Sequence, residues 1–264
     1  MTHRHFFINF VQNNLFMKIL VCISTVPDTT SKINFVNQNQ AFDTQGVTFI
    51  INPNDEFGLT RAIWFQQKEG ADVTVVTVGD SSCEPILRKC LAIGADRAIR
   101  IDATPMDGFY VASQLSELAK KETYDLIITG RESIDYNGGM VPGMIAAMLG
   151  ASYVNNCVGL EIEGDKATAA REIDGGKETV STSLPLVIGG QKGLVEESDL
   201  KIPNMRGIMM ARKKPLEVVE PNGATALSTT TKFEKSAPKG EVKLVDADNV
   251  DQLIDLLHNE AKVI

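Results

Sequence analysis

Histidine is nearly absent from the sequence, and its scarcity argues against several kinds of active site. The chain has 264 residues but only three histidines, His3, His5 and His258, which all lie near its ends. Residues 6–257 contain none. A Ser-His-Asp triad or a histidine-rich metal site inside the fold is therefore not expected.

Other common signatures are also missing. The four cysteines, Cys22, Cys83, Cys90 and Cys157, form no CxxC pair. This argues against a zinc ribbon or a dithiol redox site and favours a reducing, cytoplasmic location. No stretch reaches the ~18 consecutive apolar residues of a membrane helix, so membrane insertion is not expected. Because the GxGxxG and GxxxxGK[ST] motifs are absent too, any chemistry is expected to come from a bound cofactor.

The charge balance also limits the possible partners. Acidic residues outnumber basic ones by 34 to 26, and the net charge is -8, so a nucleic-acid partner is not expected. Hydrophobic residues make up 43% of the chain, as in a globular protein. Residues 1–16 lack the apolar region and cleavage site of a signal peptide. We expect a disordered extension or a mis-assigned start there.

Short apolar runs alternate with helical patterns over the first 150 residues. Strands are expected at 18–24, 73–78, 98–101 and 126–129, with helices following at about 55–68, 82–93, 107–118 and 139–149. This alternation predicts an α/β fold, a doubly wound and mostly parallel sheet covered on both faces. Such sheets bind ligands beyond the carboxyl ends of their strands, here at 24–29, 78–82 and 130–139.

The pattern changes after residue 150. Alternating segments at 158–162, 166–173, 178–183 and 186–188, the first three joined by Asp-Gly or Gly-Asp turns, predict an antiparallel extension of the domain. From residue 200 onward we expect an irregular segment and then a C-terminal arm, with a terminal helix at 250–261.

The segment 130–139 is a glycine-rich loop between an expected strand and an expected helix. Adjacent glycines let backbone amides approach an anion, and Arg131 could pair with a phosphate. An ordinary surface loop is the alternative, although such loops usually run only about 2–6 residues. A second segment, 201–214, carries five basic residues, three methionines and no acid. It is either a docking surface or a solvated loop.

Several motifs, in colinear order over residues 17 to about 220, resemble the electron transfer flavoprotein β subunit. Residues 171–188 resemble its signature, a basic residue followed by Asp-Gly-Gly, Glu, an aliphatic residue and Pro at fixed spacings. The other matching segments are 19–28, 52–56, 91–96, 130–135 and 208–214. The fold would then be similar to that of the adenine nucleotide α-hydrolases.

The resemblance implies a heterodimer with an α subunit that holds most of the redox FAD, and an AMP with a structural role in this chain. The dimer would carry electrons from an acyl-CoA dehydrogenase of fatty acid β-oxidation to a quinone reductase or a ferredoxin-type acceptor. No catalytic side chain and no metal are implied. Residues 17–199 would form the nucleotide-binding domain, and 200–264 the recognition loop and the C-terminal arm and helix.

The resemblance also assigns residues by position. The implied AMP contacts are Cys22, Asn52, Pro53, Asn54, Asp55, Val78, Gly130, Arg131, Glu132, Ser133, Ile134, Asp135, Tyr136, Asn137, Gly138, Gly139, Met140 and Val141. Two of the implied partner contacts, Arg171 and Glu172, would lie near the α subunit. The others are Met205, Arg206, Ile208 and Met209, of which Met205 would be the recognition-loop anchor that inserts into an acyl-CoA dehydrogenase. Two alternatives stay open: an electron-bifurcating protein with a second FAD at the AMP site that oxidises NADH, and an unrelated adenine-nucleotide-binding protein or nucleotide hydrolase.

Overall fold

The computed structural model describes residues 16–238 and 240–264, so the expectation for residues 1–16 falls almost wholly outside the described residues. The described chain forms two compact units. The larger comprises the chain up to Ile33 together with Asp43–Thr230, and the smaller comprises Asn34–Phe42 and Thr231–Ile264. No helix among the described residues is long and apolar enough to cross a membrane.

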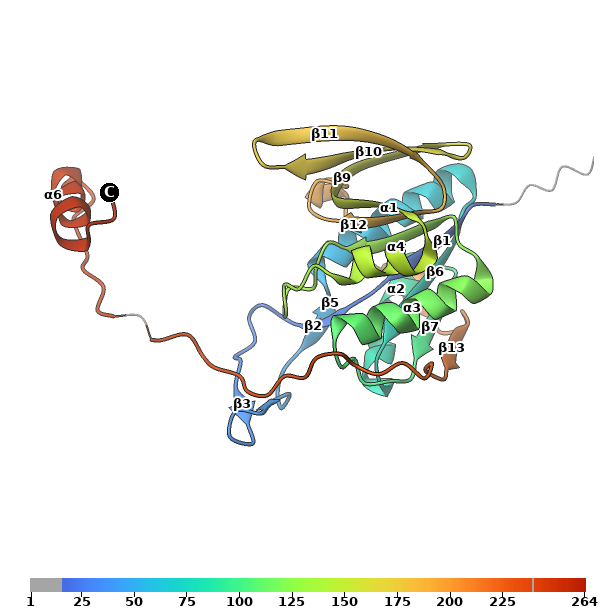
Figure 1. Cartoon of the computed structure of the whole chain (residues 1–264), viewed down its shortest axis with the longest axis horizontal. Helices are drawn as coiled ribbons and strands as arrows, with labels where there is room; N and C mark the ends of the chain where they lie inside the picture. Colours follow the sequence, from blue (N-terminus) through green and yellow to red (C-terminus); the bar gives the residue numbers. More distant parts are fainter. Residues whose placement is uncertain (1–15, 239) are drawn as a thin grey trace, which may run out of the picture. The chain divides into compact units, whose positions relative to one another are not determined.

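The larger unit is built on a nine-stranded sheet in the order β11-β10-β9-β12-β8-β1-β6-β7-β13 (Figure 1). The strands are β1 (Lys18–Cys22), β6 (Asp72–Val78), β7 (Arg97–Ile101), β8 (Leu126–Gly130), β9 (Ser152–Glu163), β10 (Lys166–Ile173), β11 (Gly176–Ser183), β12 (Leu186–Gly190) and β13 (Leu216–Val219). The seven strands from β9 to β13 in this order pair in parallel, whereas β10 and β11 pair antiparallel. A separate small ribbon joins β2 (Thr25–Pro27) to β5 (Phe49–Ile51).

Helices cover both faces of the parallel sheet. They are α1 (Pro53–Glu69), α2 (Glu84–Ile93), α3 (Gly108–Glu122), α4 (Val141–Leu149) and α5 (Met205–Ala211), with short 3-10 turns at Ser81–Cys83 and Glu197–Asp199. Because neighbouring strand residues point to opposite faces, Ile19 and Val21 join the core under α1 and α2, whereas Leu20 joins the core under α3 and α4. The predicted doubly wound α/β fold is confirmed.

Local sequence signals explain where the helices begin and end. The α1 helix starts with Pro53, whose missing amide proton costs nothing in the first turn, and it ends at Gly70 in the left-handed conformation with φ of 75°. Asp107 caps α3 by accepting a hydrogen bond from the backbone N–H of Tyr110 at 2.7 Å.

The region after residue 150 differs from its prediction in two strands. The first part of β9 and all of β12 belong to the parallel sheet, and only the rest of β9 with β10 and β11 forms the antiparallel extension. The strand β12 lies between β8 and β9, and its five residues are all buried. The order of strands in a sheet depends on pairing between residues far apart in the sequence. The turn signals of this region predict only the pairing of consecutive strands.

The segment after residue 200 is more ordered than predicted. The α5 helix replaces the expected irregular loop, and Asn204 caps it by accepting from the Gly207 N–H at 2.8 Å. Seven residues are too few to show a helical period. The missed strand β13 pairs in parallel with β7 at the edge of the sheet.

The smaller unit contains a short hairpin and the C-terminal helix. Strands β3 (Phe35–Val36) and β4 (Ala41–Phe42) form the hairpin, and the Phe35 ring stacks on Phe233 with centroids 4.8 Å apart. The α6 helix (Val250–Asp255) continues into a π-helical turn over Leu256–Ala261, which confirms the predicted terminal helix.

The α2 helix offers a test of the core. Leu87 is fully buried between α2 and the sheet, so Leu87→Ala is expected to lower the free energy of unfolding by about 2–5 kcal/mol. The same substitution at Leu227, whose side chain is 72% exposed, should change it by no more than about 0.5 kcal/mol. Urea denaturation of both variants measures the contrast, and equal losses would contradict this account of the core.

Candidate functional site

A pocket of about 430 Å³ opens at the carboxyl ends of the central strands. The ends of β1, β6 and β8 form its floor, and the loop before α4 and the start of α3 form its walls. The chain runs from β1 outward to β6 and β7 on one side of the sheet. The next strand, β8, lies on the other side of β1, with β12 beyond it. This switch in strand order is where doubly wound sheets place their ligands.

A buried carboxylate closes the floor of this pocket. Asp55 is 2% exposed and accepts hydrogen bonds from the backbone N–H of Ser24 at 2.6 Å and of Gly130 at 2.8 Å. It also accepts from the Asn52 side-chain amide at 3.0 Å. Asp55 therefore joins the first turn of α1 to the ends of both β1 and β8. Burial raises the pKa of Asp55 to about 7, against the pull of these three donors.

Gly130 is required beside this carboxylate. A Cβ atom at position 130 would lie 2.3 Å from Asp55 Oδ1, and Asp55 is held in place by its other donors. The close approach of strand end and carboxylate therefore needs a residue without a side chain at this position.

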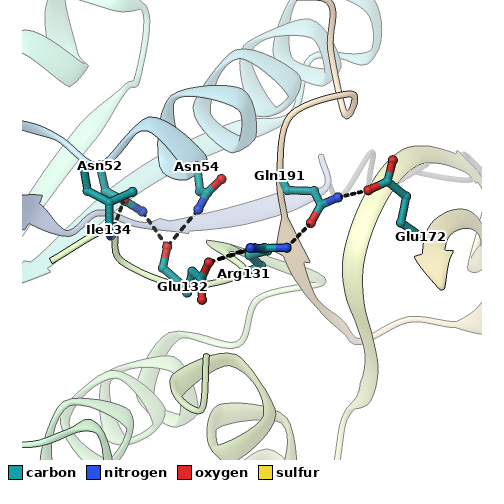
Figure 2. A network of polar contacts seen from close by, with 7 residues as sticks. All are labelled: Asn52, Asn54, Arg131, Glu132, Ile134, Glu172 and Gln191. Atoms are coloured by element: carbon teal, nitrogen blue, oxygen red, sulfur yellow. Dashed lines mark hydrogen bonds and ion pairs between the residues drawn. The ribbon is translucent and has the colours of Figure 1, made fainter. Parts of the chain in front are cut away.

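Two asparagines at the start of α1 hold the loop that follows β8 (Figure 2). The side-chain amides of Asn52 and Asn54 both donate to the Glu132 carbonyl, at 3.0 and 3.1 Å. The Ile134 N–H donates to Asn52 Oδ1 at 3.2 Å. The loop is thus fixed by side chains of a helix that lies about 80 residues earlier in the chain.

The structure brings most of the residues assigned to AMP to one pocket. Those in the lining are Cys22, Asp55, Val78, Gly130, Glu132, Ser133, Asp135, Tyr136, Gly138, Gly139, Met140 and Val141. The others, Asn52, Pro53, Asn54, Arg131, Ile134 and Asn137, lie outside the lining. Asn52 and Asn54 act on the loop from behind, and the Arg131 side chain turns toward Glu132 and Gln191.

Sequence reasoning missed a wall of the pocket formed by the segment before α3 and by Ser228 and Thr230. Asp107 binds the two together, because its Oδ2 atom accepts from the N–H groups of Leu227 and Ser228, both at 2.7 Å. The hydrogen bond from Tyr110, followed by those from residues 227 and 228, lowers the pKa of Asp107. The strand-end rule that selected 24–29 and 130–139 also applies to the loop after β7, and it could have found Asp107.

The charge in the pocket is negative. Among the residues that the structure describes, the lining contains Asp55, Asp107, Glu132 and Asp135 and no lysine, arginine or histidine. The N–H donors described above satisfy the first two, and Arg131 pairs with Glu132 at 2.7 Å. An anionic ligand would therefore depend on backbone N–H groups of the loop and on the N-terminal end of α4 rather than on basic side chains.

The cysteines are buried and unpaired. Burial raises the pKa of Cys22 and Cys90 well above the ordinary range and that of Cys157 to about 11. Burial likewise raises the pKa of Cys83. All four thiols are therefore neutral near pH 7, which makes them poor nucleophiles.

The residues assigned to partners lie on two surfaces. Arg171 and Glu172 are on β10, where Arg171 pairs with Glu178 of β11 at 2.5 Å. The other four are on α5, where Met205 and Met209 are 75% and 67% exposed and Arg206 and Ile208 are also exposed. The α5 helix packs on α2 so closely that a Cβ at Gly207 would lie 2.3 Å from the Ala92 carbonyl oxygen.

Comparison with known proteins agrees with this geometry. The profile of the electron transfer flavoprotein domain matches residues 40–224. The electron transfer flavoprotein subunit beta of Bacillus subtilis (strain 168) is 34% identical over 94% of this chain and 100% of its own length. The proteins of the same name from Syntrophomonas wolfei and Homo sapiens are 35% and 32% identical, over 94% and 82% of this chain and 98% and 86% of their own lengths.

The fold and the pocket define a doubly wound α/β protein with a ligand site at the carboxyl ends of its central strands. The profile match and the similar proteins then identify the family. The chain belongs to the electron transfer flavoprotein family, among its β subunits. The predicted resemblance is confirmed, and the role of the family is electron transfer.

The raised pKa of Asp55 predicts a pH dependence of stability. An unfolded chain releases this proton near pH 4, but the folded chain keeps it until about pH 7. The folded state therefore binds more protons across this window, and the free energy of unfolding should fall as pH rises, by up to about 1.4 kcal/mol per pH unit.

Urea unfolding at pH 4.5–7.5 measures this slope. Asp55→Asn should remove the contribution, whereas Glu56→Gln, one residue further along α1, should retain it. Parallel curves for the wild type and Asp55→Asn would contradict the proton assignment.

Proposed function

We propose that this chain pairs with an electron transfer flavoprotein α subunit, and that the heterodimer carries electrons from acyl-CoA dehydrogenases to a quinone reductase or a ferredoxin-type acceptor. The redox FAD would be held mostly by the α subunit. No side chain of this chain is assigned a catalytic role, and its part is to help position the flavin. The four unpaired cysteines fit a reducing compartment, and we propose the cytoplasm.

The pocket supports a nucleotide in this chain, and we propose AMP. A volume of about 430 Å³ lies in the lower part of the range for ligand sites, ~300–1,000 Å³. FAD has more than twice as many non-hydrogen atoms as AMP, so the volume favours the smaller ligand. Ser133, Asp135 and the glycines 138 and 139 are the polar and backbone groups of the loop that would hold it.

The α5 helix supports the proposal of a transient dehydrogenase partner. It presents Met205 and Met209 as exposed apolar side chains, with Arg206 exposed beside them. An apolar anchor with adaptable thioether side chains and a polar surround is typical of surfaces that dock and release.

Cofactor content tests the proposed function directly. We expect the purified heterodimer to release one FAD and one AMP on denaturation, measured by absorbance and chromatography. Two FAD and no AMP would replace the AMP assignment with the bifurcating alternative, in which the second flavin oxidises NADH. A heterodimer without flavin absorbance would overturn the proposed function.

Two glycines provide a matched test of the pocket. A Cβ atom at Gly138, in the lining, or at Gly223, outside it, would meet nothing within 4 Å, so neither Gly→Ala change should destabilise the protein. Gly138→Ala should weaken AMP binding by roughly tenfold, because the extra methyl keeps the loop backbone from the ligand. Gly223→Ala should bind as the wild type does. Calorimetric titration measures both, and equal affinities would move the nucleotide away from this loop.

A further inference from the structure

A chain of polar contacts runs from the pocket loop to the antiparallel extension (Figure 2). Arg131 Nη1 donates to Gln191 Oε1 at 3.1 Å, and the Gln191 side-chain amide donates to the carboxylate of Glu172. Gln191 follows the end of β12 and is 7% exposed, whereas Glu172 lies exposed on β10. One buried side chain therefore connects the loop after β8 to a carboxylate at the surface.

The donors and acceptors on either side of Gln191 fix the orientation of its side-chain amide. A guanidinium can only donate, and an ionised carboxylate can only accept. Gln191 must therefore present its oxygen to Arg131 and its nitrogen to Glu172. Turning the amide over would set nitrogen against guanidinium and oxygen against carboxylate, and it would lose both bonds.

Arg131 is itself fixed at three points. Its backbone N–H donates to the Gly190 carbonyl at 2.8 Å, next to Gln191. Its guanidinium donates to Glu132 Oε1 from Nε at 3.1 Å and from Nη2 at 2.7 Å. The asparagines at the start of α1 in turn hold the Glu132 carbonyl. The guanidinium is thus directed away from the pocket, whose lining does not include it.

We propose that Arg131 is a positioning residue for the partner surface rather than a ligand of the nucleotide phosphate. It orients Gln191, which holds the Glu172 carboxylate in one position at the surface that meets the α subunit. This inference rests on the proposed function, because the family resemblance assigns Glu172 to the surface near the α subunit.

The effect expected from this arrangement is a gain in partner affinity. A free glutamate side chain samples several rotamers, and docking must then fix one of them. A carboxylate that is already held loses less freedom on docking. Releasing it should weaken association by roughly two- to tenfold, which is the range for one immobilised side chain.

The test measures two affinities for each full-length variant, one for the α subunit and one for AMP. Arg131→Met removes the guanidinium, and Gln191→Met replaces the amide by an apolar side chain of similar length. Both should weaken α-subunit binding two- to tenfold. Gln191→Met should leave the AMP affinity within about twofold, and Arg131→Met should do so in the background of Glu132→Gln, where no carboxylate of the pocket loses its partner. Lys192→Met is the matched control, because this exposed neighbour pairs with Glu197 at 2.9 Å and not with the chain of contacts. It should bind both as the wild type does.

A double-mutant cycle separates positioning from a general loss of structure. In the background of Glu172→Gln, the change Arg131→Met should have little further effect on α-subunit affinity, because both act through one carboxylate. Independent, multiplicative effects would overturn the inference. So would a loss of AMP affinity on Arg131→Met in the Glu132→Gln background, which would make the guanidinium a phosphate ligand. A wild-type chain that binds neither AMP nor an α subunit would refute the proposed function itself, a result distinct from both.

Discussion

The buried carboxylate of Asp55 determines how the functional end of this protein is built. It accepts N–H groups from Ser24 after β1 and from Gly130 at the end of β8, two strands that pair side by side. Beyond the last ladder bonds the two strand ends would otherwise be free to separate. A single short side chain on the first turn of α1 keeps them together, and Gly130 has no side chain because there is no room for one.

This arrangement also fixes the position of the loop after β8. Asn52 and Asn54 come just before Asp55 in the chain and hold the Glu132 carbonyl, so strand ends and loop share one support. This explains why a loop rich in glycine can still present its backbone in one place. The glycines let the loop backbone come close to a ligand. The asparagines at the start of α1 hold the loop in one conformation.

Sequence reasoning reached the fold and much of the site because their signals are local. Apolar strands such as 126–129, caps such as Asp107 and the Gly-rich loop are each visible within a few residues. The position of β12 inside the sheet and the course of residues 228–230 along the pocket depend on partners about 60 and about 120 residues away. Arg131 shows the limit most clearly. Its place in the motif favours a phosphate contact, but Glu132 beside it and Gln191, 60 residues later, hold its guanidinium instead.

Most of the charged side chains in the pocket bind other groups of the protein, and the backbone of the loop is left to bind the ligand. Asp55 and Asp107 accept from N–H donors, and Glu132 pairs with Arg131, so three of the four acidic side chains that line the site bind neighbouring protein groups. A ligand then binds wherever the loop amides point, and its affinity depends on loop geometry more than on ionic attraction. The loop is fixed by α1 on one side and by the end of β12 on the other, through Arg131 and Gly190. The backbone of this one rigid loop can therefore bind a ligand in the pocket, while its side chains position groups on the neighbouring surface.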